Sequence, residues 1–167
     1  MRGLLPIFLS VLAWPVIAQD LSFDATATED CLSNAADMPS RLACVGASAE
    51  ACIATPDGYT TVGMGFCYSE EAAYWDERLN TAFASLRAGE RDLMKEMKDI
   101  GATVPDTAIA LRDMQRAWIV SRDASCNYEY STWGGGTGGG PAVAACLMHE
   151  TARQTLKLEE RLMDRFE

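Results

Sequence analysis

The stretch that decides the fold runs from residue 69 to residue 101, SEEAAYWDERLNTAFASLRAGERDLMKEMKDIG. Ser69 is a good N-cap, and Glu70 and Glu71 follow in the first turn, where the helix dipole favours carboxylates. Large apolar residues then recur every seven positions, at Leu79, Leu86, Leu93 and Ile100. This spacing predicts one long helix that packs on others along a single seam, with Gly89 as a point where it kinks or breaks.

Two further long helices are predicted after this one. Gly101 ends the first helix, and Pro105 with Asp106 starts the second. The apolar side of the second helix is formed by Ile109, Leu111, Met114, Trp118 and Ile119. A glycine-rich loop follows, and Pro141 suits the first turn of the third helix. The apolar side of the third helix is formed by Leu147, Thr151, Leu158 and Leu162, with Phe166 near its end.

The segment before Ser69 is rich in cysteine and predicts short helices. One helix is expected around residues 31–36, a break at Met38-Pro39, and a second helix at 41–54 with Ser40 as its cap. Residues 55–65 are rich in Gly and Thr and are interpreted as a loop. β-Branched residues are sparse and do not alternate. The predicted fold is all-α: a disulfide-stapled helical bundle of three long helices plus a Cys-rich N-terminal helical hairpin.

The first 18 residues have the pattern of a signal peptide: Arg2 is followed by the apolar run 4–14 and the small-residue exit 16–18. We therefore expect a single mature helical domain at 19–167, with a Cys-rich cap at 28–67 and the bundle at 69–166. The leader predicts a periplasmic or secreted protein. The sequence has no second apolar stretch that would predict a membrane span. It also has no cysteine directly after the leader, so a lipid anchor is not expected.

Six cysteines in such a compartment predict three disulfides. Cys126 and Cys146 flank the glycine-rich loop, and a bond between them would staple two antiparallel helices, which is worth roughly 3 kcal/mol on the loop-entropy model. The other four cysteines allow three connectivities. We favour Cys31–Cys44 across the Met38-Pro39 turn, together with Cys52–Cys67 across the Gly-rich segment. Neither a C-x-x-C redox motif nor a zinc-ligand spacing is present.

The chain is acidic, with 24 Asp and Glu against 14 Lys and Arg and a net charge of −10. If Arg2 were removed with the leader, the mature chain would lose one positive charge and become more acidic. This balance argues against nucleic acid or an anionic membrane surface as a partner, because both need basic patches. It suits a cationic partner. The alternative is that the negative charge only keeps the protein in solution.

The glycine-rich loop is the candidate binding element. It is formed by Trp133, Gly134, Gly136, Gly138 and Gly140 with their neighbours. The formal G-x-G-x-x-G is no dinucleotide fingerprint, because no strand precedes it. We interpret the loop as a protruding binding loop with Trp133 as an aromatic anchor, and the alternative is a flexible linker. We expect no cofactor.

Catalysis and metal binding are not expected. His149 is the only histidine, and three disulfides would leave no thiol for Cys/His chemistry. The carboxylate pairs Glu70/Glu71, Asp76/Glu77 and Glu159/Glu160 fall on helix faces that we interpret as solvated rather than on the walls of a glycosidase cleft. The chain is therefore not predicted to be an enzyme.

Two polar motifs belong to the first and second long helices. The first holds Trp75, Asp76 and Asn80, and the second holds Gln115, Arg116, Trp118 and Arg122. The tryptophans are interpreted as core. The polar residues are interpreted as a structural network, with an Asp–Arg pair and an Asn/Gln hydrogen bond across the seam of the two helices. A ligand site is the alternative.

These residues also carry a resemblance. The order C…E-x(4)-W-D-x(2)-L-N, then Q-R-A-W-I-x(2)-R-D-x(2)-C, then a glycine loop and a last Cys, resembles the LprI-type lysozyme-inhibitor domain family. The matching positions run from Cys67 to Cys146, and the resemblance covers about residues 67–162. It implies a small, secreted, disulfide-bonded helical domain. It also implies inhibition of lysozyme in the cell envelope, and it offers no catalytic residues.

The sequence thus leads to a secreted or periplasmic binding protein that inhibits a cationic lysozyme-type muramidase by steric blockage. The alternative is a structural or interaction protein of the cell envelope with an unknown partner. An enzyme that acts on cell-wall glycan through a carboxylate pair is a third hypothesis.

Overall fold

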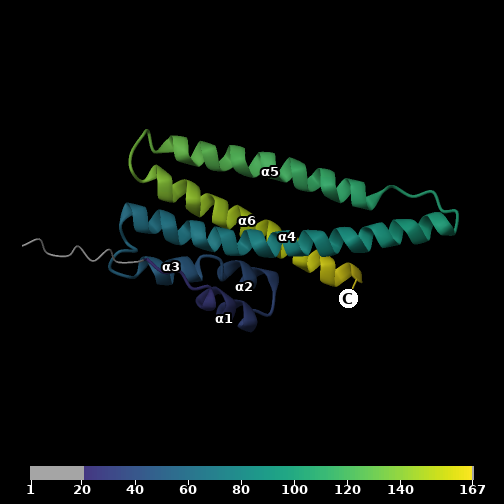
Figure 1. The fold of residues 1–167 in the computed structure, drawn as a ribbon, viewed down its shortest axis with the longest axis horizontal. Helices are drawn as coiled ribbons and strands as arrows, with labels where there is room; N and C mark the ends of the chain where they lie inside the picture. The colour runs from purple at the N-terminus through teal and green to yellow at the C-terminus, as the bar shows by residue number, and fades with distance from the viewer. Residues whose placement is uncertain (1–20, 167) are drawn as a thin grey trace, which may run out of the picture.

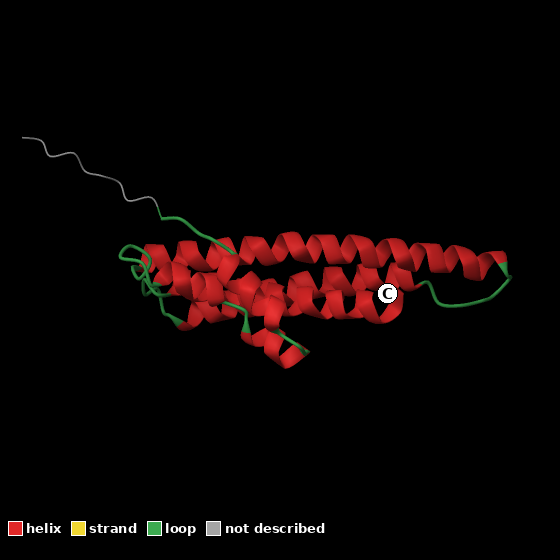
Figure 2. Cartoon of the chain, turned by 90° about the horizontal axis from the view of Figure 1, so that it is seen from below, coloured by secondary structure: helices red, strands yellow, loops and turns green. Residues whose placement is uncertain are grey.

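The computed structural model describes residues 21–166, so the signal-peptide interpretation of residues 1–18 lies outside the described residues. Within 21–166 the chain forms six helices and no strand, which confirms the all-α class (Figures 1 and 2). Three long helices make the bundle: α4 (Thr61–Asp99), α5 (Thr107–Thr132) and α6 (Gly139–Phe166). The short helices α1 (Thr26–Asn34), α2 (Met38–Ala43) and α3 (Ala47–Ile53) pack against α4 and α6 on the side away from α5 (Figure 1).

The bundle has two buried clusters along α4 and α6. The first surrounds Trp75, which is 0% exposed, and lies under the short helices with Met148 and Leu156. The second lies further along α4 at Leu79 and Leu86, with side chains of α5 packed against it. The heptad seam predicted on α4 is therefore buried at these two leucines. It is not buried at Ile100, which is 74% exposed.

Gly89 does not break α4, contrary to expectation. The helix continues through it from Thr61 to Asp99. A Cβ at Gly89 would lie 2.9 Å from the ring of Phe166, so this position is small because the end of α6 rests against it. Beyond Gly89, α4 projects past the end of α6 (Figure 1).

Two predicted helix starts were wrong. Thr60 rather than Ser69 is the N-cap of α4, and its hydroxyl accepts from Gly63 N at 2.9 Å. The helix expected at 41–54 is two helices, α2 and α3, separated by Gly46 at φ 98. That conformation is costly for any residue with a side chain, which explains the glycine at this break between the two helices. Ser40 is the third residue of α2, and Asp37 is the cap.

Asp37 and Ser40 form a capping box at the start of α2. The Ser40 hydroxyl and then its backbone N–H donate to the Asp37 carboxylate, which lowers the pKa of Asp37 below its ordinary value. Because the folded pKa is lowered, this stabilisation is present above the ordinary pKa of an aspartate and is lost as the pH falls through the folded value.

Three disulfides join the elements: Cys31–Cys44, Cys52–Cys67 and Cys126–Cys146, with Cα–Cα distances of 5.5, 5.7 and 5.5 Å. The pairing is the one favoured by the spacing. The first ties α1 to the end of α2, the second ties α3 to α4, and the third ties α5 to α6. They leave no free cysteine in the described chain.

The buried carboxylate of Glu71 holds the short helices onto α4. Glu71 is 0% exposed. One carboxylate oxygen accepts from Gly46 N at 2.7 Å, from the Thr28 hydroxyl at 3.1 Å and from Trp75 Nε1 at 3.1 Å. The other accepts from Ala49 N at 2.7 Å. Because the N-cap of α3 is a glycine without a side chain, Glu71 takes the place of the capping residue.

We predict that Glu71→Ala lowers the free energy of unfolding by about 3 kcal/mol or more, because it leaves buried backbone N–H groups without an acceptor. Urea unfolding followed by circular dichroism measures this change. The neighbouring Glu70 is exposed, and Glu70→Ala is the matched control, with an expected change within about 0.5 kcal/mol. Equal stability of the two variants would contradict the role of Glu71.

Candidate functional site

The glycine-rich loop between α5 and α6 lies at one end of the bundle, beside the turn between α3 and α4 (Figure 1). Trp133 is the C-cap of α5, and Gly134 and Gly135 have φ 55 and 84. Gly136 N donates to Trp133 O at 2.9 Å, and Gly139 N donates to Gly136 O at 3.1 Å. The loop therefore has a defined turn structure, closed at its base by Cys126–Cys146.

Trp133 packs against the loop that follows it. A Cβ at Gly138 would lie 2.2 Å from the indole ring, so only glycine allows the ring this close to the backbone. A Cβ at Gly139 would lie 3.0 Å from the ring of Tyr130. Trp133 nevertheless remains 49% exposed. Its indole is thus held in one place by the glycines while one side faces solvent.

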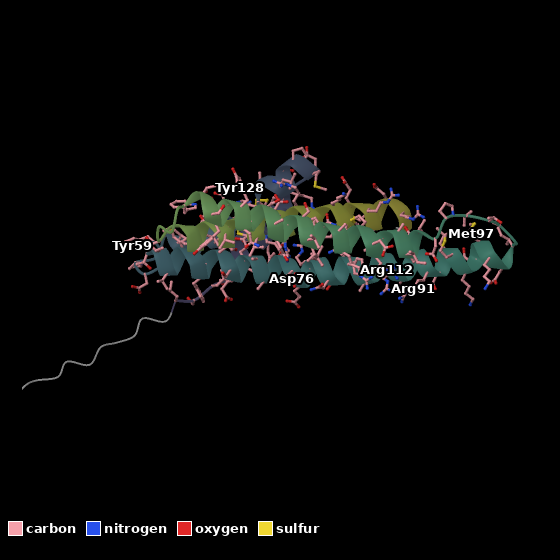
Figure 3. All side chains as sticks on the ribbon, turned by 90° about the horizontal axis from the view of Figure 1, so that it is seen from above. Tyr59, Asp76, Arg91, Met97, Arg112 and Tyr128 are labelled. Atoms are coloured by element: carbon pink, nitrogen blue, oxygen red, sulfur yellow. A yellow bond between two sulfur atoms is a disulfide. The ribbon has the colours of Figure 1, made fainter. Side chains whose placement is uncertain are left out.

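Exposed apolar side chains gather around this loop. They come from the end of α5, the start of α4 and the turn before it: Tyr59 68%, Val62 80%, Tyr128 71%, Tyr130 51% and Trp133 49% exposed. Tyr59 and Tyr128 lie at the same end of the molecule in Figure 3. A groove of about 450 Å³ runs between the first turns of α4 and α6, lined by residues that include Val62, Thr137 and Pro141. We call this end of the molecule the glycine-loop end.

The net negative charge belongs to the larger part of the bundle, which carries this end and which we call the acidic half. Residues 21–86 and 117–156, which include the short helices, hold thirteen acidic and four basic side chains. Residues 87–116 and 157–166 hold nine of each. The excess negative charge of the described chain therefore belongs to the part with the glycine-loop end. A field of this kind favours the approach of a cationic partner to that half.

A second hollow, of about 840 Å³, lies between the short helices and the middle of α4 and α6. On its wall Glu159 binds two arginines: Arg78 Nε and Nη2 donate to it at 3.0 and 2.8 Å, and Arg41 Nη2 at 2.5 Å. Arg78 also donates to the Tyr74 hydroxyl at 2.7 Å. Burial alone would lower the pKa of Arg78, but the hydrogen bonds to Tyr74 and Glu159 raise it above its ordinary value.

This arginine pair ties the cap to the bundle. Arg41 belongs to α2, Arg78 to α4 and Glu159 to α6, so one carboxylate links three helices. The Arg78 guanidinium also lies 5.1 Å from the centre of the Trp75 ring. The two arginines already occupy both oxygens of the Glu159 carboxylate. We therefore interpret this site as a contact that holds three helices together rather than as a proton-transfer site.

The structure does not bring together the polar network expected between the first two long helices. Asp76 accepts from Asn80 at 2.9 Å on α4 itself, at an exposed site. Gln115 of α5 accepts from Gln154 of α6 at 2.9 Å. The expected Asp–Arg pair is absent from the contacts of the described residues, since Arg116 has no polar side-chain partner there. The reason is that the polar partner of α5 is supplied by α6, which packs against both other helices.

Arg122 and the two motif tryptophans have structural contacts. Arg122 Nε donates to Asp123 at 2.9 Å, and its guanidinium lies 5.0 Å from the centre of the Trp118 ring. Trp75 is buried, and its carbonyl accepts from the Thr155 hydroxyl of α6 at 3.0 Å. These residues hold helices together, and none of them lies at the glycine-loop groove.

The sequence predicts that all the carboxylate pairs are solvated. The structure shows that two of these carboxylates are not. Glu71 is buried and Glu159 is half-buried, and each accepts hydrogen bonds from other helices. The other four carboxylates are exposed: Glu70, Asp76, Glu77 and Glu160. A sequence signal for Glu71 exists only in hindsight: it lies four residues before Trp75, on the same helix face. No group of three His, Cys, Asp or Glu in residues 21–166 could hold a metal ion, and His149 is exposed.

The fold and this end of the molecule define a disulfide-bonded, all-α domain with an acidic half and an exposed aromatic end. The profile described as "Lysozyme inhibitor LprI" matches residues 52–158, from the end of α3 to most of α6. The chain therefore belongs to the LprI lysozyme-inhibitor family, as its motifs predicted. This is a family of inhibitors rather than of enzymes.

Two relatives share most of this chain. It is 29% identical over 157 residues to an uncharacterized 17.7 kDa protein in the puhA 5′ region of Rhodobacter capsulatus, covering 90% of this chain and 96% of the relative. It is 31% identical over 129 residues to an uncharacterized protein of Rhizobium meliloti (strain 1021), covering 75% and 93%. No solved structure matches the chain significantly.

We predict that Gly138→Ala displaces the Trp133 indole, because the added methyl group would occupy the place of the ring. The fluorescence emission should move to longer wavelength, while the far-ultraviolet circular dichroism stays unchanged. Gly140→Ala is the matched control, since nothing lies within 4 Å of a Cβ at that position. Identical emission spectra for the two variants would show that the indole does not pack on Gly138.

Proposed function

We propose that this protein inhibits a cationic, lysozyme-type muramidase by covering its sugar-binding cleft with the glycine-loop end. Membership of the LprI family supports the class of partner. The observation that carries the choice of surface is the combination of exposed aromatic side chains with the acidic half of the bundle. Binding sites on proteins favour Tyr and Trp because these side chains give much contact area at little conformational cost.

The loop suits steric blockage. Its backbone turn is fixed by Trp133 and closed by Cys126–Cys146, so little conformational freedom would be lost on binding. The exposed Tyr59 and Val62 flank it from the α3–α4 turn and widen the surface. Such a preformed projection could enter a cleft without rearrangement of the bundle.

The acidic half raises the rate at which the protein associates with a cationic enzyme. Its thirteen acidic against four basic side chains would attract a cationic enzyme toward the glycine-loop end. We therefore expect the association rate to fall as ionic strength rises, while the dissociation rate changes little. Stopped-flow measurement at several salt concentrations tests this expectation, and an association rate independent of salt would contradict it.

An extracytoplasmic location agrees with this role. Three disulfides persist in oxidising compartments, and the family acts on an enzyme of the cell wall. None of the described helices is long and apolar enough to cross a membrane.

The test is a turbidity assay in which lysozyme lyses bacterial cell walls, titrated with the oxidised protein. We expect inhibition near stoichiometric amounts, and loss of inhibition after reduction of the disulfides. An absence of inhibition across several lysozyme types would overturn the proposal and favour an interaction protein of the cell envelope.

We predict that Trp133→Ala weakens inhibition at least tenfold, because it removes the largest exposed side chain of the loop. Circular dichroism should be unchanged. Ile100→Ala is the matched control: it also truncates an exposed apolar residue, but at the far end of α4, and inhibition should be retained. Inhibition by Trp133→Ala at the strength of the original protein would rule out the loop as the contact.

A further inference from the structure

Helix α5 is the outermost layer of the bundle. It packs mainly on α6 and also on α4, and no other described helix contacts it. Figure 1 shows α5 along one edge of the molecule, with the other helices on one side of it. In Figure 3, which looks from above, no other helix covers α5 between Arg112 and Tyr128. One side of α5 therefore faces solvent along its length.

The solvent-facing side of α5 is mostly apolar. Because successive residues of a helix turn by about 100°, one sector of about 140° lies opposite the buried Gln115. Every residue of this sector between 107 and 125 is exposed. Ile109 is 48% and Val120 70% exposed. We call these residues the α5 outer face: Ile109, Ala110, Asp113, Arg116, Ala117, Val120, Ser121 and Ala124.

The α5 outer face has the pattern of a helix that packs against another helix. Its members at 110, 113, 117, 120 and 124 recur at alternating intervals of three and four, which is the spacing of a coiled-coil seam. The exposed side of α6 differs, because its exposed residues between 149 and 161 are all polar: His149, Arg153, Lys157, Glu160 and Arg161. No described helix covers the seam on α5.

The two charged residues of the α5 outer face have little use inside the molecule. Arg116 makes no ion pair or side-chain hydrogen bond with another described residue. Asp113 pairs with its neighbour Arg112 at 2.8 Å, but 56% of the Asp113 side chain is exposed, and such surface pairs contribute little. One positive and one negative charge make the face neutral in a chain of net charge −10. Two acidic molecules can therefore approach along this face without local repulsion.

These two charges select how a second α5 would pack here. In a parallel pair each residue meets its own copy, so like charges would face one another. In an antiparallel pair with the two-fold axis between residues 114 and 115, Asp113 lies opposite Arg116 of the second copy, and this contact occurs twice. Sliding the helices by three residues in either direction would put Asp113 or Arg116 opposite its own copy.

The same register also matches the apolar side chains. It places Ile109 of one copy opposite Val120 of the other, again twice. The small side chains of Ala110 and Ala117 let two helices approach closely, because interaxial distance depends on the side chains at the contact. Opposite charges and large apolar residues thus agree on one register.

We propose that this protein forms a symmetric dimer in which the α5 outer faces of two copies pack antiparallel. Two Asp113–Arg116 ion pairs lie at its centre, and two Ile109–Val120 contacts flank them. In this register residue 107 of one copy lies opposite residue 122 of the other, so the glycine-rich loop, which begins at Trp133, stays outside the contact. The proposal therefore does not depend on the inhibition proposed above.

The test is sedimentation equilibrium of the oxidised protein over the micromolar concentration range, at a salt concentration that screens its net charge. We expect a reversible monomer–dimer equilibrium. Val120→Glu should raise the dissociation constant about tenfold or more, because it puts a carboxylate against Ile109 of the second copy. Circular dichroism should be unchanged, since Val120 is exposed in the monomer.

The matched control is Val62→Glu, the same substitution at an 80% exposed position of α4, at the glycine-loop end. It should dimerise like the original protein. Loss of the dimer in Val62→Glu but not in Val120→Glu would overturn the proposal and place the contact at the glycine-loop end. A monomer at every concentration of the original protein would also overturn it.

A charge exchange tests the register itself. Asp113→Arg and Arg116→Asp should each weaken the dimer about tenfold, because each sets like charges opposite one another. The double variant Asp113→Arg/Arg116→Asp should recover dimerisation, and so should an equimolar mixture of the two single variants. If neither the double variant nor the mixture recovers, the antiparallel Asp113–Arg116 contact is wrong.

Discussion

The fold depends most on one buried carboxylate. Glu71 on α4 accepts hydrogen bonds from the backbone at Gly46 and Ala49, from Thr28 and from Trp75, and so joins α1 and α3 to the long helix. These short helices have too few residues to be stable alone. Their attachment rests on this carboxylate, on Glu159 with its two arginines, and on the disulfides. A charge in such a place is tolerated because its hydrogen-bonding capacity is filled.

The bundle separates two surfaces of different character. The glycine-loop end is aromatic and belongs to the acidic half, whereas the far end of α4, residues 91–99, holds three basic and three acidic side chains and is followed by the exposed Ile100. The long, continuous α4 keeps the two apart, because it begins beside the first and ends at the second. The family membership bears on the first surface only.

The sequence predicted the helical class, the three long helices, the favoured disulfide pairing and the family, because periodicity, caps and cysteine spacing are local signals. It failed where tertiary contacts override local preference. Residues 61–65 hold two glycines and look like loop, yet they form the first turns of α4, where Gly63 approaches the backbone of Asp57 and Gly58. The interruption at Gly46 and the burial of Glu71 are likewise effects of packing. The partner of Gln115 could not be predicted, because the pattern of residues along one helix does not show which other helix packs against it.

The central claim is that the glycine-loop end contacts the inhibited enzyme. Hydrogen–deuterium exchange of the oxidised protein, alone and with an excess of lysozyme, tests it most directly. The account predicts slower exchange at residues 55–62 and 128–140 in the presence of the enzyme, and unchanged exchange at 91–106. Protection confined to the far end of α4, or to the hollow beside Arg41 and Arg78, would contradict it.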